Sequence, residues 1–194
     1  GAATVRELLR RGHTVTAIVR PKSSKLDTIL EGNEEALLSG RLLVTENDLS
    51  EPEKLLEKVT KPQDVFCHFG WGGSGSASRT DKALQEKNME ISLETIRTAK
   101  ALGCKKFLFS GSQAEYGMHQ DLITEDTVCE PKSLYGEAKL AMREKGEKLC
   151  DELGLRYIHA RIFSASLTVL RPAPVFSQSS FSVGSLSPAR YGVF

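Results

Sequence analysis

The sequence predicts an α/β fold in which helices cover both faces of one doubly wound parallel sheet. Two observations predict it. Apolar, strand-like segments alternate along the chain with segments of helical period, and consecutive parallel strands need a crossover between them. The chain has 194 residues, of which 40% are hydrophobic and 26% charged, as is typical of a single globular domain. We therefore expect one domain, whose ligands lie outside the carboxyl ends of the strands.

The first part of the chain contains a helix followed by three predicted strands. The helix places Val5, Leu8 and Leu9 on one face and stops at Gly12. Pro52 stands in the first turn of a later, short helix, where no intrahelical N–H is needed. In chain order the strands and this short helix are "HTVTAIV" (13–19), "RLLVTENDL" (41–49), "EPEKLLEKV" (51–59, the helix) and "DVFCHFG" (64–70).

The second part continues the alternation with two long helices. One helical pattern runs from about Asp81 to Leu102, and the other spans roughly Leu134 to Leu153. Each is followed by an apolar strand, first "KKFLFSGS" (105–112) and then "RYIHARIF" (156–163).

Composition and residue spacing argue against several classes of function. The formal net charge is +1 and no basic stripe is interleaved with aromatic residues, so nucleic acid is not an expected partner. No segment approaches the roughly 18 apolar residues of a membrane span, and no secretory signal is visible, so we expect a cytoplasmic protein without a membrane partner. The histidines form no ligand motif and the cysteines no C-x-x-C pair, so we expect no metal, and reduced thiols at Cys67, Cys104, Cys129 and Cys150.

The distribution of charge separates the last part of the chain from the rest. All 25 acidic residues lie at or before Glu152, whereas residues 153–194 carry four arginines and no acid. From Ser164 onward the sequence is rich in Ser, Pro and Val and sustains neither a helical nor a strand period. We expect residues 164–194 to be an atypical, weakly ordered or disordered tail, produced by translation in an altered reading frame, by translation of an unspliced exon, or by divergence.

Tyr135 and Lys139 form the candidate catalytic pair. They are four residues apart in a predicted helix, so their side chains share a face and can meet at one ligand. A phenol is a poor base at neutral pH, but an ammonium group a few ångströms away favours the phenolate. The same spacing also arises by chance, so its surroundings decide its meaning. Upstream, "FLFSGSQAEYG" places Ser112 at the carboxyl end of a strand, where it is either a substrate-binding hydroxyl or an ordinary turn hydroxyl.

These motifs, in this order, resemble the extended short-chain dehydrogenase/reductases of the NAD-dependent epimerase/dehydratase family. The matching segments are "SGSQAEYG", "SLYGEAKL" and "EKNMEIS", the last of which contains Asn88. The resemblance extends from Gly1 to about Ser164. It implies that residues 1–163 form a partial NAD(P)-binding Rossmann domain.

The resemblance also implies roles for individual residues. Tyr135 would be the general acid/base, and Lys139 would stabilise its phenolate and hold the nicotinamide ribose. Ser112 would orient the reacting oxygen of the substrate, and Ser164 would also lie beside the substrate. Asn88 would pin its helix next to the cofactor site, although an exposed helical asparagine is an equally good interpretation.

Two further segments would form walls of the cofactor site. Phe69, Gly70 and Trp71, in "CHFGWGG", match the loop after the fourth strand of the family, although a buried strand followed by a glycine-rich turn would look the same. Asp48 and Leu49, in "ENDLS", match the loop that meets the adenine. The alternative for Asp48 is a helix cap.

The choice of cofactor depends on the residues that follow the strand 13–19. An enzyme that uses NAD usually places an acid there to bind the ribose hydroxyls, whereas an arginine accommodates the extra phosphate of NADP. The segment offers Arg20, Lys22, Ser23 and Ser24, and no acid before Asp27. We therefore expect NADP, with NAD as the alternative; a solvated basic loop would have the same composition.

The type of reaction is narrowed by one departure from the family pattern. Members that dehydrate sugar nucleotides carry an Asp-Glu pair just after the position of Ser112, where this chain has Gln113 and Ala114. A 4,6-dehydratase is therefore disfavoured, and a reductase or epimerase of nucleotide-linked sugars is expected, with most resemblance to the sugar-nucleotide 4-ketoreductases. The resemblance further implies a homodimer face on the helix from Asp81 and the helix that carries Tyr135.

Both ends of the chain depart from the family pattern. Gly1 matches only the last glycine of the phosphate-binding turn, so we expect the first strand to be missing and the sheet to have a gap. The family's substrate-binding region should follow Ser164, where the atypical tail begins. Two hypotheses remain: a fragment of an NADP-dependent sugar-nucleotide oxidoreductase or epimerase, and a non-catalytic remnant or dinucleotide-sensing scaffold of the same fold.

Overall fold

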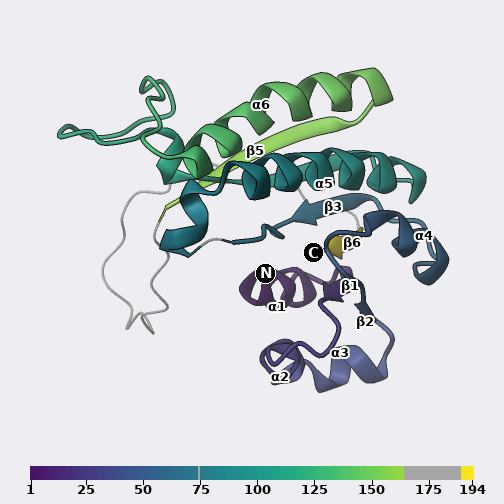
Figure 1. Ribbon diagram of the computed structural model, residues 1–194. Coiled ribbons are helices and arrows are strands. Elements are labelled where there is room, and N and C mark those ends of the chain that lie inside the picture. The colour runs from purple at the N-terminus through teal and green to yellow at the C-terminus, as the bar shows by residue number, and fades with distance from the viewer. Residues whose placement is uncertain (74, 164–188) are drawn as a thin grey trace.

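The computed structural model describes residues 1–73, 75–163 and 189–194, and these form one parallel sheet (Figure 1). The order of strands across the sheet is β2-β1-β6-β3-β4-β5. Every neighbouring pair is parallel, so the predicted doubly wound α/β class is confirmed. The strands are β1 (Thr14–Val19), β2 (Leu42–Glu46), β3 (Val65–His68), β4 (Lys106–Ser112), β5 (Arg156–Ile162) and β6 (Arg190–Val193).

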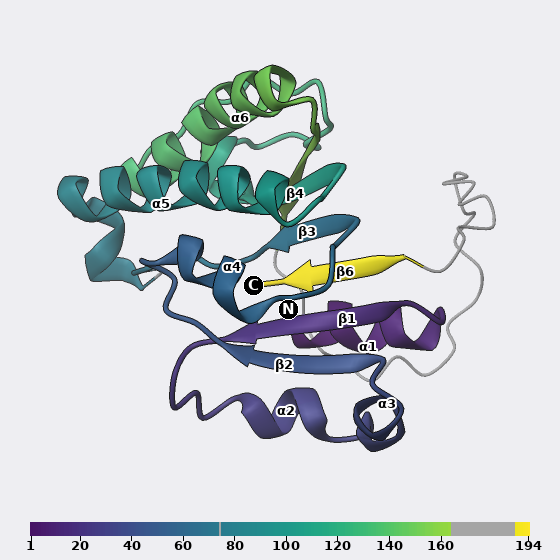
Figure 2. The same cartoon turned by 90° about the vertical axis from the view of Figure 1, so that its right-hand side faces the viewer.

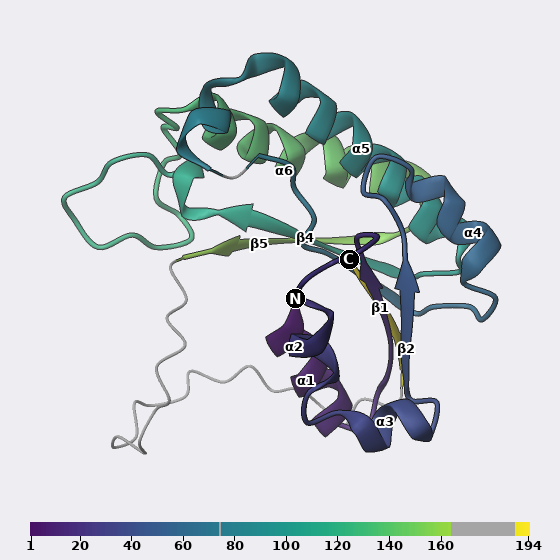
Figure 3. The same ribbon diagram turned by 60° about the horizontal axis from the view of Figure 1, so that its bottom comes forward.

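Helices lie on both faces of the sheet (Figure 3). One face carries α4 (Leu55–Lys58), α5 (Lys82–Ala101) and α6 (Leu134–Leu153), and the other carries α1 (Ala2–Arg10), α2 (Leu26–Leu30) and α3 (Glu34–Leu38). The sequence patterns predict α1, α4, α5 and α6 but not the two five-residue helices. Three short 3-10 helices complete the described elements: η1 (Pro52–Lys54), η2 (Ser76–Thr80) and η3 (Gln113–Glu115).

The two long helices have side-chain caps that fix their starts. Asp81 caps α5, because its carboxylate accepts a hydrogen bond from Leu84 N–H (3.1 Å), and Ser133 caps α6 in the same way. Gly154 ends α6 with a φ of 67°, the left-handed conformation that glycine adopts without strain. α6 begins near the carboxyl end of β4, so the Ser133 cap also sets the position of Tyr135.

Each face of the sheet has its own apolar core. On the α5 and α6 side the fully buried aromatic residues of the core are Phe66, Phe107 and Phe109. The opposite core packs α1 against the strands through Val5, Leu9, Val15, Leu42 and Val193. The middle of the sheet is therefore buried on both faces, as expected for parallel strands, whereas Ile158 and Ile162 of the edge strand β5 are 37% and 41% exposed.

β6 corrects an expectation drawn from the sequence. The gap expected beside β1 is filled, because β6 pairs in parallel with β1 on one side and with β3 on the other (Figure 2). Gly192 lies opposite both Thr16 and Phe66, and the Phe66 ring occupies the space next to its Cα. Residues 164–188, the remainder of the expected tail, lie outside the described residues.

No helix within the described residues is both long and apolar enough to span a bilayer. The same residues contain no cluster of three or more His, Cys, Asp or Glu side chains suited to bind a metal ion.

Candidate active site

The predicted catalytic pair lies in the first two turns of α6, beside the end of β3. Ser133 Oγ accepts a hydrogen bond from Gly136 N–H (3.1 Å), which holds the first turn in place. The rings of Tyr135 and Trp71 meet edge to face, with centroids 6.2 Å apart. Lys139 Nζ lies 3.9 Å from the centroid of the Trp71 ring. Tyr135 and Lys139 thus share a face of the helix, as their spacing predicts, and they meet around one indole.

Lys139 is a buried lysine, with only 2% of its surface exposed. Its Nζ donates a hydrogen bond to the carbonyl oxygen of Ser110 (2.7 Å), at the carboxyl end of β4. Burial lowers the pKa of Lys139 to about 7, and the carboxylate of Glu115 opposes this shift only in part. A buried, strongly shifted group at the ligand-binding edge of the sheet is a candidate functional residue.

The shifted lysine should make the stability of the protein depend on pH. Between the folded pKa of about 7 and the ordinary value of 10.5, the unfolded chain binds a proton that the folded chain has released. The free energy of unfolding should therefore rise with pH in this window, by up to about 1.4 kcal/mol per unit. Urea unfolding at pH 7, 8 and 9 measures this slope. In a Lys139→Met variant the free energy of unfolding should rise less steeply with pH. An equal slope in both proteins would contradict the lowered pKa of Lys139.

Two cationic groups lie near the Tyr135 ring. Lys139 Nζ is 5.9 Å from its centroid, and the guanidinium carbon of Arg79, in η2, is 5.1 Å from it. Both distances lie within the usual range of a cation–π contact. Sequence reasoning does not identify Arg79, because nothing in "GSGSASRT" predicts that η2 folds back over α6.

Ser112 stands at the end of β4 and starts η3. Its Oγ accepts a hydrogen bond from Ala114 N–H (3.2 Å), and its own N–H donates to Glu115 Oε1 (2.7 Å), which together form a capping box. Gly136 packs against the carbonyl group of Ala114, where any side chain on Gly136 would collide. This close approach brings the start of α6 against the segment that carries the Ser112 hydroxyl.

A buried carboxylate, Glu115, organises the carboxyl ends of β4 and β5. It is fully buried and accepts hydrogen bonds from His159 Nε2 (3.0 Å), Arg161 Nε (3.0 Å) and the N–H of Ser112. Burial alone would raise its pKa, but these donors hold the pKa of Glu115 below its ordinary value. Arg161 also donates to the hydroxyl of Tyr116 (2.7 Å). No sequence pattern predicts this cluster as a whole, although the S-x-x-E spacing of Ser112 and Glu115 is the signal of a capping box.

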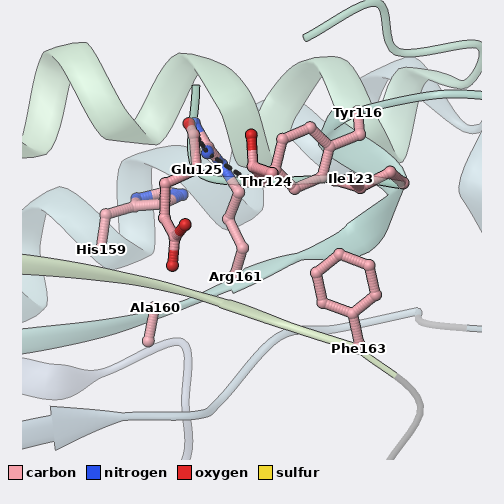
Figure 4. A pocket seen from close by; sticks show the side chains of 8 residues that line it. All are labelled: Tyr116, Ile123, Thr124, Glu125, His159, Ala160, Arg161 and Phe163. Atoms are coloured by element: carbon pink, nitrogen blue, oxygen red, sulfur yellow. Dashed lines mark hydrogen bonds between the residues drawn. The ribbon is translucent and has the colours of Figure 1, made fainter. Parts of the chain in front are cut away.

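A pocket opens next to this cluster (Figure 4). Its volume is about 370 Å³, within the roughly 300–1,000 Å³ of small-molecule sites. The rings of Tyr116 and Phe163 and the guanidinium group of Arg161 give it both apolar and polar surfaces. The residues that line it come from β5 and from the segment after η3: Tyr116, Ile123, Thr124, Glu125, His159, Ala160, Arg161 and Phe163.

The residues predicted to select the cofactor follow β1 and β2 at the same edge of the sheet. Arg20 and Ser23 belong to one turn, closed by a hydrogen bond from Ser23 N–H to the carbonyl oxygen of Arg20 (3.1 Å), and Ser24 is exposed beside it. Asp48 accepts hydrogen bonds from the N–H (2.9 Å) and hydroxyl (2.6 Å) of Ser50. These bonds, with a smaller contribution from the charge of Arg20, lower the pKa of Asp48. The Asp48 carboxylate thus stabilises its own turn and caps no helix.

The loop after β3 is held by Asn88 of α5. Asn88 Oδ1 accepts from Gly72 N–H (3.0 Å), and its Nδ2 donates to the carbonyl oxygen of Gly72 (2.8 Å). Asn88 is 3% exposed, so the alternative of an exposed helical asparagine is wrong. Phe69, Gly70 and Trp71 lie in the strand-end segment that this contact immobilises.

A nicotinamide dinucleotide is the cofactor that the resemblance implies, and the described residues include the predicted contacts to both of its halves. The Lys139 ammonium group provides donors suited to ribose hydroxyls beside Trp71. Leu49 touches Gly70, where a Cβ would collide with it, so the two predicted cofactor walls are in contact. Gly1 precedes α1, and its carbonyl oxygen accepts a hydrogen bond from Val5 N–H (3.0 Å). Ser164 lies outside the described residues.

Sequence comparison identifies relatives of the chain. The profile of the NAD dependent epimerase/dehydratase family matches residues 1–169. The D-erythronate dehydrogenase of Cupriavidus necator is 28% identical over 198 aligned positions, which cover 100% of this chain and 60% of the relative. The UDP-glucose 4-epimerase of Lactobacillus helveticus is 28% identical, over an alignment that covers 86% of this chain and 48% of the epimerase. The chain thus spans about half to three fifths of these relatives.

Comparison with solved structures gives the same assignment. A crystal structure of a UDP-glucose 4-epimerase superposes with a TM-score of 0.67 and 28% identity, over 83% of this chain and 47% of the other. The family profile and this superposition therefore agree. The chain belongs to the NAD-dependent epimerase/dehydratase family.

Proposed function

We propose that this chain carries the catalytic edge of an NADP(H)-dependent oxidoreductase or epimerase that acts on a nucleotide-linked sugar. One observation carries the proposal. Tyr135 and the buried Lys139 share a helix face beside Trp71, and Gly136, between them, packs α6 against the segment that bears Ser112. Acid/base chemistry at a hydroxyl or carbonyl group requires a proton donor, a group that stabilises its charged form and a group that orients the reacting oxygen.

In this proposal each side chain has one role. The Tyr135 oxygen would hold or release the proton of the reacting hydroxyl group, and Lys139 would stabilise the phenolate that results. The Ser112 hydroxyl would orient the reacting oxygen through a hydrogen bond. A bound nicotinamide ring would supply or accept the hydride. Asn88 and Trp71 would keep the loop after β3 in place around it.

The preference for NADP rests on the turn after β1. Arg20 lies at this turn with Ser23 and Ser24, and an arginine there suits the extra phosphate group. The neighbouring Asp48 carboxylate reduces the net positive charge at this position. The expected preference is therefore modest. Titration with NADPH and NADH should show tighter binding of NADPH by about threefold to thirtyfold, which corresponds to one or two hydrogen bonds to the phosphate.

A test of activity should use the chain with NADPH or NADH and a panel of nucleotide-linked sugars and their 4-keto derivatives. Carbonyl-dependent loss of absorbance at 340 nm, or interconversion of the 4-epimers, is the expected result. Tyr135→Phe should lower kcat by about a hundredfold to ten-thousandfold, while Tyr191→Phe, in β6 and away from the site, should leave kcat unchanged. No turnover of any member of the panel would contradict the substrate class.

A second candidate function is oxidation of a small sugar acid. It is favoured by the match to a D-erythronate dehydrogenase over the full length of this chain. Adding D-erythronate and related four-carbon acids to the same panel separates the two candidates. If neither class of substrate reacts and the dinucleotide still binds, a non-catalytic dinucleotide-sensing role takes the place of both.

A further inference from the structure

A chain of hydrogen bonds joins the segment that bears Ser112 to α6, the helix that bears the candidate catalytic pair. Glu115 Oε1 accepts a hydrogen bond from the Ser112 N–H (2.7 Å), and His159 Nε2 lies 3.0 Å from both carboxylate oxygens of Glu115. On the other side of the ring, His159 Nδ1 lies 3.2 Å from the hydroxyl oxygen of Tyr157. That hydroxyl donates to the carbonyl oxygen of Met142 in α6 (2.9 Å). His159 is therefore the middle link of the chain.

The protons along this chain determine which nitrogen atoms of His159 carry hydrogen. Tyr157 has one hydroxyl proton and keeps it, because burial raises the pKa of Tyr157. The Met142 carbonyl oxygen can only accept, so it takes this proton, and the Tyr157 oxygen is left to accept from Nδ1–H. Burial alone would raise the pKa of Glu115, but its donors lower it, so the carboxylate is ionised and Nε2 must donate as well. A ring in which both nitrogens donate is an imidazolium.

Two glycines leave room for this chain of hydrogen bonds. Gly111 is buried in β4, and a Cβ there would lie 2.6 Å from both Glu115 Oε1 and His159 Nε2. Any other residue would therefore push the carboxylate and the ring apart. Glycine weakens the interior of a strand and often marks such a close approach. On the helix side, the Tyr157 ring packs against Gly146, where a Cβ would collide with it. Both contacts favour a single geometry of the chain.

Charged groups from several elements act on His159. The Glu115 carboxylate favours the imidazolium, whereas the Arg161 guanidinium opposes it but is paired with the same carboxylate. Burial lowers the pKa of Lys139 in α6 to about 7, so this group carries only part of a positive charge at neutral pH. The His159 side chain is 8% exposed, so water cannot readily replace either of its hydrogen bonds. Among the described residues, further titratable groups near His159 or Tyr157 are Tyr116, Glu125, Glu147 and Cys150.

We propose that His159 is a positioning residue, which as an imidazolium ties the Ser112 segment to α6 and so sets the separation of Ser112 from Tyr135. The inference rests on the proposed function, because this separation matters only if the two side chains act on one substrate. Loss of the Nδ1 proton would turn the Tyr157 hydroxyl away from Met142 and break the hydrogen bond to α6. Small displacements of reacting groups lower the rate of a reaction strongly.

The first measurement is the protonation state, by 15N NMR of the full chain labelled at its four histidines. A His159→Gln variant identifies the His159 signals. At pH 7.5 an ordinary histidine is about nine-tenths neutral, whereas His159 should have both ring nitrogens protonated. Glu115→Gln and Tyr157→Phe each remove one acceptor, so both should shift the signals toward neutral imidazole. A neutral His159 in the parent chain at pH 7.5 overturns the inference and leaves the proposed function intact.

The second measurement is turnover of the substrate panel, together with isothermal titration of the dinucleotide. Tyr157→Phe should lower kcat by about threefold to tenfold, because the link to α6 is lost, and should leave the dissociation constant of the dinucleotide unchanged. Tyr191→Phe removes the same hydroxyl group from β6 and should leave both quantities unchanged. It is the matched control.

The outcomes separate the inference from the proposed function. An imidazolium signal in the parent chain, with the expected loss of kcat in Tyr157→Phe, supports the positioning role. An imidazolium signal with an unchanged kcat in Tyr157→Phe overturns that role. If the parent chain turns over no member of the panel, the proposed function fails and the positioning role fails with it.

Discussion

Replacement of Val193 by aspartate is expected to unfold the protein. Val193 is 3% exposed in the central strand of the sheet and belongs to the core on the α1 side. The substitution removes a buried apolar side chain, worth about 1.5–3 kcal/mol, and places an unpaired carboxylate in its position, which costs several kcal/mol more. The sum is comparable to the roughly 5–15 kcal/mol that stabilises a typical domain. Far-UV circular dichroism during urea titration should therefore show loss of the folded baseline.

Arg190→Ala is the matched control for this substitution, because Arg190 is in the same strand and is exposed. It should change the free energy of unfolding by no more than about 0.5 kcal/mol. If Val193→Asp unfolds at the same urea concentration as the parent chain, β6 does not occupy the centre of the sheet.

Glu115→Ala should destabilise the protein by about 3–5 kcal/mol, because it leaves a buried arginine without its counter-charge. The side chains of Arg161 and His159 are only 12% and 8% exposed, so water cannot readily replace the lost carboxylate. The N–H of Ser112 loses its acceptor at the same time. Reversible denaturation in urea measures the loss, and kcat should also fall, because Ser112 is held in position by this carboxylate.

An exposed ion pair in the following loop provides the control. Glu130 lies 3.5 Å from Lys132, and both side chains are 62% exposed. Glu130→Ala should therefore cost no more than about 1 kcal/mol. Similar losses for the two alanine variants would mean that the Glu115 cluster contributes little to stability.

Much of the fold could be predicted from the sequence because five of its strands and its long helices have strong local patterns. The apolar run of β3 and the alternation of β4 are visible without neighbours. The pair formed by Tyr135 and Lys139 could be predicted for the same reason, since helical geometry alone places residues four apart on one face. Such features depend on the periodicity of one segment and need no knowledge of its partners.

The features that the sequence did not reveal depend on partners far away in the chain. β6 has only four residues, and Gly192 at its centre is unfavourable in an isolated strand, so its conformation is set by β1 and β3 on either side. Glu115 looks like any surface glutamate until β5 brings Arg161 and His159 beside it. The placement of Arg79 over Tyr135 likewise depends on how η2 folds back.

The central position of β6 has a consequence for biosynthesis. The hydrogen bond from Ala189 N–H to His13 Nδ1 joins residues 176 positions apart, so the strand at the middle of the sheet is synthesised long after its two neighbours. Until β6 leaves the ribosome, β1 and β3 of the nascent chain each carry an unpaired edge, and such edges favour association with other chains. Closing so long a loop also slows folding. We therefore expect the sheet to be completed only once β6 has been synthesised, and a nascent chain without β6 to associate with other chains more readily.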